Sequence, residues 1–186
     1  MRTRKYLGVT LLELVFSMGL LALLAGLAIP GFRTSLRAAA IRSASFELLA
    51  GVQRARANSI LESRPGLLCP TNSAGACLPA GALASSWRSY LEANQGESDQ
   101  GESNQGEPGR GETGSGQQEL GGQVLPRGVV IRSSRSPLRF WPTAFAASPG
   151  TLTICDLRNE VPPRAIVISQ SGRARLAIVS PTACLT

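Results

Sequence analysis

Hydrophobic residues are concentrated in one long run near the start of the chain. Residues Val9 to Ile29 carry a single charged side chain, Glu13. About 20 apolar residues are enough for a helix to cross the ~30 Å hydrocarbon core of a membrane, so this run predicts a transmembrane helix over residues 9–30. A carboxylate inside such a helix costs about 2–3 kcal/mol near mid-membrane and less toward one end. Glu13 is therefore expected to serve a function.

Helical spacing continues beyond Pro30. Apolar residues recur at intervals of three and four as far as about Leu61, and Pro65 with Gly66 predicts the end of the helix. The predicted apolar face comprises Leu36, Ala39, Phe46, Ala50, Ala57 and Ile60. The arginines at more exposed positions are Arg33, Arg37, Arg54 and Arg56.

Short segments with the character of β-strands, separated by turn residues, follow this helix. They are Leu67–Cys69, Trp87–Leu91, Val124–Arg132, Leu138–Trp141, Thr151–Leu157, Arg164–Ser169 and Arg173–Ser180. This order predicts an α+β fold in which a long N-terminal helix, its first half transmembrane, packs on an antiparallel β-sheet or small β-sandwich. The 186 residues suffice for the anchor and one globular domain over residues 31–186.

Residues 94–118 form a degenerate repeat of five pentads: NQGES, DQGES, NQGEP, GRGET and GSGQQ. The repeat has almost no apolar residues and cannot bury a core, so residues 94–119 are expected to be a disordered insert in a surface loop. An acidic lure or a calcium-binding loop is the functional alternative. Acidic residues this diluted by glycine do not resemble a calcium cage.

The residues in front of the apolar run are basic, with Arg2, Arg4 and Lys5. The positive-inside rule places this end in the cytoplasm, so the chain is expected to cross the inner membrane once, with the residues after Pro30 in the periplasm. A secretory signal would have a shorter apolar core followed by its cleavage site. Here the small residue, Gly8, precedes the apolar core. Cleavage after Gly8 would remove only residues 1–8 and create an amino terminus within one helical turn of Glu13.

This segment resembles the type IV pilins and type II pseudopilins, which share a basic leader, Gly, a cleavage site, Glu a few residues later and a long apolar helix. The match runs from Gly8 to Pro30, where the family commonly has a helix-kinking proline. Val9 departs from the usual Phe. The resemblance implies processing by prepilin peptidase at Gly8 and Val9, with methylation of the new terminus. It also implies filament assembly through Pro30 and Glu13, the latter pairing with the terminal amine of a neighbouring subunit.

Four cysteines lie on the predicted periplasmic side, where the oxidising environment favours two disulfides. Three pairings are possible. Local closure of Cys69 with Cys77, which are eight residues apart, and a C-terminal link from Cys155 to Cys184 is the pairing we favour. A zinc site is the alternative, but the chain has no histidine and no CxxC pair.

The absence of histidine removes Ser/His/Asp and Cys/His catalytic systems. Outside the apolar helix and the insert, the acidic residues form no recognisable constellation. They are Glu47, Glu62, Glu92, Asp156 and Glu160. We therefore expect neither an enzyme nor a bound cofactor.

Charge is distributed unevenly along the chain. The net charge is +7, but residues 94–119 contain six acids and one arginine, which leaves +12 on the remainder. Arginine provides eighteen of the nineteen basic residues. Arginine forms planar, bidentate contacts with phosphate, so the bias is compatible with nucleic-acid binding. A GC-rich genome would produce the same bias.

The middle of the chain resembles one branch of the family, the GspH/FimT group of minor pilins and pseudopilins. That group carries a helix with an Ala-Arg step, a strand ending in Cys, a Gly-containing loop to a second Cys, and then a Trp. The matching segments here are Leu49–Ile60, Leu67–Pro70, Gly75, Cys77, Trp87, Thr151–Cys155, Arg164–Ser169 and Gly172–Arg173. The Gly that usually follows the Trp is replaced by Arg88-Ser89-Tyr90.

The FimT-like members of this group carry a C-terminal GRxR motif that is associated with DNA binding in natural transformation. Gly172, Arg173 and Arg175 satisfy this motif. A two-residue turn at Ser171-Gly172, with strands ending at Gln170 and starting at Arg173, would place both arginines on one face, about 7 Å apart. Ala174, Leu176 and Ile178 would then point to the core.

Arg158 and Arg164 add positive charge before this turn, and the expected ligand is double-stranded DNA bound through its backbone without sequence preference. An RxR pair in a strand is more commonly a solvated face. Three functions therefore remain open: a DNA-contacting minor pilin, a GspH-like pseudopilin of type II secretion, and a membrane-tethered binding protein outside any filament. The first two would have other pilin subunits as partners.

Overall fold

The computed structural model describes residues 10–93, 117–143 and 146–184. It divides the chain into two compact units, residues 1–38 and 39–186. One helix, α1 (Leu11–Leu61), contributes residues to both units. Gly8, Val9 and most of the predicted insert lie outside the described residues.

Residues 10–38 consist of the first part of α1, in which Thr10 acts as the N-cap. The Glu13 amide donates a hydrogen bond to Thr10 Oγ1 at 3.3 Å, as expected for a cap, and the Glu13 side chain is exposed on the first turn. In the part of the chain that is described, no single helix is long and apolar enough to cross a membrane. One bent pair of helical segments, Leu11–Gly26 with Gly31–Leu61, meets the length and composition requirement together.

Helix α1 ends at Leu61, as the sequence predicts. Ser63 adopts the left-handed conformation with φ of 53°, and the Arg64 amide donates to the Ser59 carbonyl at 3.2 Å. These are features of a helix C-cap. The chain then enters the first strand at Gly66.

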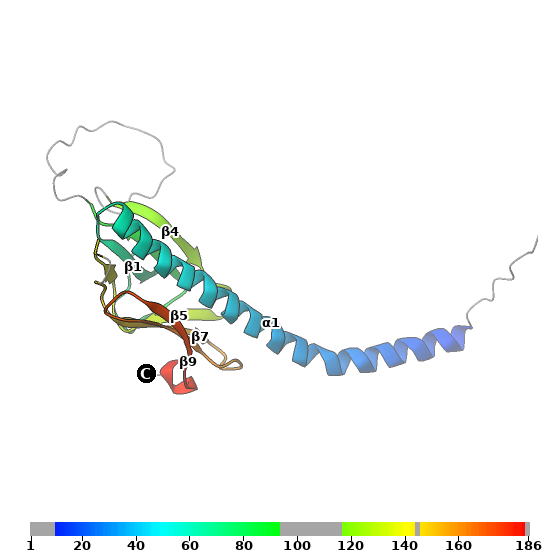
Figure 1. The fold of residues 1–186 in the computed structure, drawn as a ribbon. Coiled ribbons are helices and arrows are strands. Elements are labelled where there is room, and N and C mark those ends of the chain that lie inside the picture. The colour runs from blue at the N-terminus through cyan, green and yellow to red at the C-terminus, as the bar shows by residue number, and fades with distance from the viewer. Residues whose placement is uncertain (1–9, 94–116, 144–145, 185–186) are drawn as a thin grey trace, which may run out of the picture. The chain divides into compact units, whose positions relative to one another are not determined.

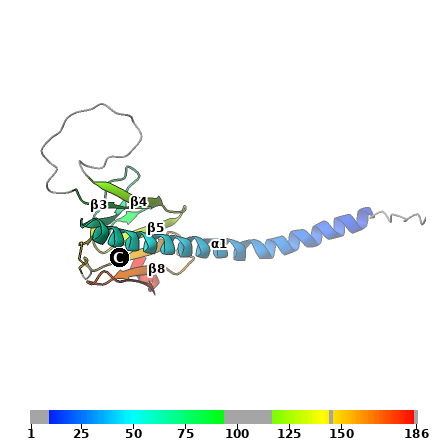
Figure 2. The same ribbon diagram turned by 45° about the horizontal axis from the view of Figure 1, so that its top comes forward.

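Residues 39–186 combine the C-terminal half of α1 with two antiparallel sheets (Figures 1 and 2). The strands are β1 (Gly66–Thr71), β2 (Leu83–Ala84), β3 (Ser86–Leu91), β4 (Gln118–Val124), β5 (Val129–Ser133), β6 (Leu138–Phe140), β7 (Gly150–Asp156), β8 (Arg164–Ile168) and β9 (Ala174–Ile178), followed by the 3-10 helix η1 (Pro181–Cys184). One sheet has the order β4-β3-β1-β6 and the other β2-β5-β7-β8-β9. The predicted α+β class is confirmed.

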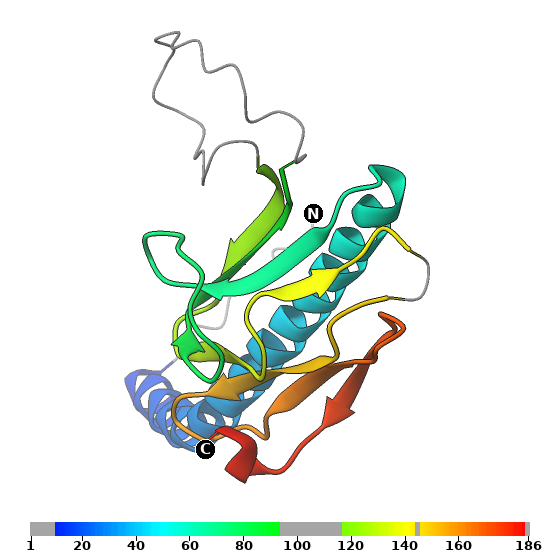
Figure 3. The same cartoon turned by 90° about the vertical axis from the view of Figure 1, so that its left-hand side faces the viewer.

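Figure 3 shows the C-terminal half of α1, from residue 39 onward, running behind the strands of both sheets. A single core joins the helix to the four-stranded sheet, through Trp87 and Phe140, and to the five-stranded sheet, through Ile154 and Ile166. These four side chains are at most 1% exposed. Burial of such large side chains contributes about 1.5–3 kcal/mol each.

The predicted apolar face of α1 is wrong. All six residues assigned to it are exposed, and Phe46 is 54% exposed. The buried face consists of Ile41, Ala44, Ser45, Leu48, Gly51, Val52, Ala55 and Ser59. Small residues dominate this face because the helix lies close to the sheets, and a Cβ on Gly51 would overlap the Trp87 ring.

One predicted strand and one boundary of the predicted insert need correction. The predicted strand Val124–Arg132 is in fact the end of β4, a turn and then β5, because Gly128 adopts φ of +84° and the Val129 amide bonds to the Pro126 carbonyl at 3.0 Å. The predicted insert extends too far, since Gln118 and Glu119 already belong to β4 and pair with β3. Strand β3 continues through the Arg88-Ser89-Tyr90 segment, with a register shift opposite β4 between Ser89 and Tyr90.

Both predicted disulfides are present. Cys69–Cys77 links β1 to the loop that follows it, and Cys155–Cys184 links β7 to η1, with Cα–Cα distances of 5.6 and 5.9 Å. All four sulfurs are bonded in pairs, which overturns the zinc alternative.

A candidate nucleic-acid interface at the β8–β9 hairpin

The turn between β8 and β9 contains three residues, Gln170 to Gly172. The Gly172 amide donates to the Ser169 carbonyl at 2.8 Å, and the Ser169 amide donates to the Arg173 carbonyl at 3.1 Å. Gly172 adopts φ of +73°, as in three-residue hairpin loops that end in a left-handed glycine. The predicted two-residue turn is therefore one residue too short. The Arg173 amide bonds to the Ser169 hydroxyl at 3.2 Å, so regular pairing begins only at Ala174.

Helix α1 supports this turn through Arg56. Its Nη1 donates a hydrogen bond to the Gly172 carbonyl at 3.2 Å. A Cβ at position 172 would lie 3.0 Å from Arg56 Nε and 3.4 Å from the Ala147 Cβ. Gly172 is thus favoured by its backbone conformation, and an added Cβ would also crowd these neighbours. The sequence placed Arg56 among the exposed arginines, whereas it is half-buried against the turn.

Arg173 and Arg175 are both exposed beside the turn. Arg175 lies opposite Val167 of β8, on the face of the sheet that points away from Ile166 and Ile168. Ala174 and Leu176 pack against the core, as expected. Ile178 does not, since it is 83% exposed. Strand β9 is an edge strand of its sheet, and among the described residues no other strand pairs with its outer edge.

The structure does not bring Arg158 and Arg164 to the same place. Arg164 begins β8, four residues before Ile168, so at about 3.3 Å per residue it lies roughly 13 Å along the strand from Ile168 and further still from the turn. It also falls on the opposite face of the sheet from Arg175, because it pairs with Ile178 and Ile154. Arg158 is exposed in the β7–β8 connection, and its amide bonds to Asp156 Oδ1 at 3.3 Å.

The Asp156 carboxylate is occupied by backbone hydrogen bonds and presents little negative charge at the surface. It accepts hydrogen bonds from the amides of Arg158 and Glu160, the latter at 3.0 Å, and the residue is only 6% exposed. From residue 120 to the end, eight arginines are opposed by Asp156 and Glu160 alone. Residues 120–186 therefore carry an excess of positive charge, which favours contact with phosphate.

A second cluster, not identified from the sequence, surrounds the Cys69–Cys77 disulfide. The Tyr90 hydroxyl lies 3.0 Å from Cys77 Sγ, and Arg139 holds Glu92 through two contacts of 3.0 and 3.1 Å. Burial, and then the Glu92 charge, raise the pKa of Tyr90 above 10.0, partly offset by Arg139. This cluster is structural, since it ties β3 to β6 and to the disulfide loop.

A long N-terminal helix packed on antiparallel sheets is the pilin-like fold, and the comparisons agree. Two crystal forms of the type IV minor pilin FimU of Pseudomonas aeruginosa match 77% of this chain. The identities are 19% and 18%, the TM-scores 0.50 and 0.51, and the shares of FimU covered 98% and 94%. Residues 44–172 match the family described as Type II transport protein GspH. The chain therefore belongs to the GspH/FimT family of minor pilins and pseudopilins. None of the curated proteins compared with it matches.

Proposed function

We propose that this protein is a minor pilin that contacts DNA through the β8–β9 hairpin. The observation that carries the proposal is the pair of exposed arginines, Arg173 and Arg175, presented by a turn that Arg56 supports from the helix. A rigid support lowers the entropy cost of binding at the arginines. Contacts of this kind go to phosphate and do not read bases.

The proposal for the other end of the chain follows from the family. Prepilin peptidase would cleave after Gly8, Val9 would become the methylated terminus, and Glu13 would pair with the terminal amine of a neighbouring pilin subunit in the membrane. Pro30 would shape the helix for packing in the filament. Glu13→Ala should then prevent incorporation into a filament while leaving the folded domain unchanged, as measured by filament fractionation and circular dichroism.

DNA contact is tested with the full chain in detergent and a fluorescent duplex. Arg173→Ala/Arg175→Ala should weaken binding and reduce the slope of log K against log salt by about 0.9 for each phosphate that the variant no longer neutralises. Arg158→Ala/Arg164→Ala is the matched control, because it removes the same charge from the β7–β8 connection and the start of β8, away from the turn. Equal effects of the two double variants, or no binding by the unaltered protein at low salt, would contradict a specific role of the turn.

The second candidate is a minor pseudopilin of type II secretion, which the family description favours. In that case the arginines are a solvated strand face, and the partners are other filament subunits or an exported protein. The neighbouring genes distinguish the two candidates, since a pilus cluster supports the first and a secretion operon the second.

A further inference from the structure

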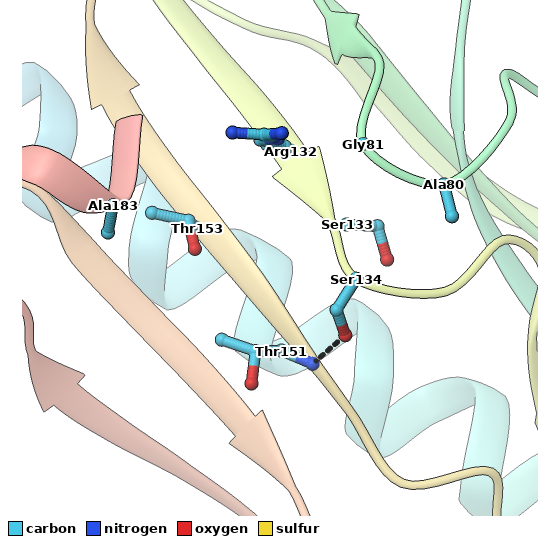
Figure 4. A pocket seen from close by; sticks show the side chains of 8 residues that line it. All are labelled: Ala80, Gly81, Arg132, Ser133, Ser134, Thr151, Thr153 and Ala183. Carbon is cyan, nitrogen blue, oxygen red and sulfur yellow. Dashed lines mark hydrogen bonds between the residues drawn. The ribbon is translucent and has the colours of Figure 1, made fainter. Parts of the chain in front are cut away.

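A groove of about 440 Å³ lies on the face of the five-stranded sheet opposite its core (Figure 4). Its floor is formed by β5 and β7, where Arg132 pairs with Thr153. Side chains alternate along a strand, so Arg132, Thr151 and Thr153 point away from the buried Ile131 and Ile154. A groove of this volume is within the range of small-molecule sites.

Both walls of the groove are fixed. On one side, the Gly81 amide donates to the Ser133 carbonyl at 2.8 Å and holds the loop at Ala80 and Gly81 against β5. On the other side, Ala183 of η1 lines the groove, and the Cys155–Cys184 disulfide ties η1 to β7. The groove is therefore formed before any ligand arrives.

The described lining combines Arg132 and four hydroxyl residues with two alanines and a glycine, and it contains no carboxylate. Arg132 lies beside Gly81, where a Cβ would be 3.7 Å from its Nη2. Thr153 is only 8% exposed, and its hydroxyl faces the groove without a hydrogen-bond partner among the residues that the structure describes. A ligand oxygen placed in the groove can therefore accept a hydrogen bond from the Thr153 hydroxyl.

We propose that this groove binds a phosphate group, held by the Arg132 guanidinium and the hydroxyls of Thr153 and Thr151. Arg132 has another interaction within the protein, and the five donors of a guanidinium allow a ligand contact beside it. Arginine with hydroxyl donors is a common arrangement for this anion.

The groove shares its face of the sheet with Arg175. Arg175 pairs with Val167, and Val167 pairs with Thr151. These three residues therefore form one row across three strands. At about 4.8 Å per strand, Thr151 and Arg175 are roughly 10 Å apart. The phosphate has two sources, a free small molecule or a DNA strand that also reaches Arg175, and the second source rests on the proposed function.

The test measures binding of inorganic phosphate to the full chain in detergent by calorimetry. Arg132→Gln and Thr153→Val should each weaken binding, the former at least tenfold, while Arg135→Gln, an exposed arginine outside the lining, should not. Loss of folding is monitored by circular dichroism, and Thr153→Val keeps the side-chain shape if Arg132→Gln proves unstable. Equal phosphate affinity in all four proteins, or no binding to the unaltered chain, would overturn the proposal.

A duplex-binding experiment with the same variants identifies the source. If Arg132→Gln also weakens DNA binding and lowers the salt slope by about 0.9, the phosphate is that of DNA. If only inorganic phosphate binding falls, the ligand is a free phosphate compound. The proposal that the groove binds phosphate is then supported even if the hairpin does not bind DNA. Arg173→Ala/Arg175→Ala should leave inorganic phosphate binding unchanged in either case.

Discussion

Arg56 of the long helix donates a hydrogen bond to the carbonyl of Gly172, a residue 116 positions further along the chain. This hydrogen bond joins the helix to the hairpin that carries the GRxR motif. A side chain at position 172 would crowd Arg56, because an added Cβ would lie 3.0 Å from its Nε. The orientation of the turn is therefore set by the helix as well as by its own strands.

Replacement of Gly172 by Ala should destabilise the protein by about 1–2 kcal/mol, the cost of a left-handed conformation for a residue with a Cβ, plus the cost of crowding Arg56. Gly128→Ala is the matched control, since Gly128 has φ of +84° and no atom within 4 Å of an added Cβ. Urea unfolding followed by circular dichroism should show the larger destabilisation for Gly172→Ala. Equal effects would mean that Arg56 does not restrict this position.

Replacement of Gly51 by Ala should destabilise the protein by about 1–3 kcal/mol through overpacking, although alanine is the better helix former. The added Cβ would overlap the buried Trp87 ring. Gly31→Ala is the control, because nothing lies near an added Cβ there. Its thermal midpoint should stay the same or rise, whereas that of Gly51→Ala should fall. A rise for both would contradict the close approach of α1 to β3.

The two disulfides should differ in their contribution to stability. A crosslink reduces the entropy of the unfolded chain more when it closes a longer loop. The 29-residue separation of Cys155 and Cys184 should thus contribute about 1 kcal/mol more than the 8-residue separation of Cys69 and Cys77. Paired Cys→Ala variants compared by urea unfolding measure the difference. A greater destabilisation on removing Cys69–Cys77 would show that local packing outweighs chain entropy.

Tyr90 should titrate above its ordinary value of 10.0, because burial and Glu92 raise its pKa more than Arg139 lowers it. The folded state then holds the proton more tightly than the unfolded state. The protonated Tyr90 hydroxyl therefore contributes its full stabilisation of the fold below pH 10, and this stabilisation is lost as the pH rises through the pKa of Tyr90 in the folded state. The chain has two tyrosines, so Tyr6→Phe allows tyrosinate absorbance to report Tyr90 alone.

The same absorbance titration has two controls. In urea, Tyr90 of the Tyr6→Phe protein should titrate near 10.0, and Glu92→Gln should lower its pKa in the folded state. A folded midpoint at or below the urea value would contradict the burial of this hydroxyl beside the disulfide.

The helix, the sheet class and the disulfide pairing could be predicted from the sequence because each depends on local pattern or spacing. The packing face of α1 could not. Its buried positions include Ala44, Gly51 and Ser59, whose small side chains give no hydrophobic signal, while the more conspicuous Phe46 is exposed. Close approach to a tryptophan selects small residues, and this requirement is visible only when the sheet is in place.

The candidate site was predictable in part for a similar reason. Gly172, Arg173 and Arg175 form a contiguous motif, and the structure places them together at one turn. Arg56 and the groove at Arg132 depend on pairing between distant segments. The alternation of side chains along β5 and β7 indicates that the sheet has two faces, but only the folded structure shows that η1 lies over one of these faces.

Strands β3 and β4 pair from Leu91 with Gln118 to Ser86 with Val124, although a long segment of sequence separates them. The entropy cost of closing such a connection rises only with the logarithm of its length, by about 0.6 kcal/mol for each doubling. The pairing on either side fixes the exit and return points of the chain. A foreign peptide of comparable size exchanged for residues 96–115 would therefore leave and rejoin the fold at these two strands, which offers a practical position for an affinity tag or fluorescent label on this protein.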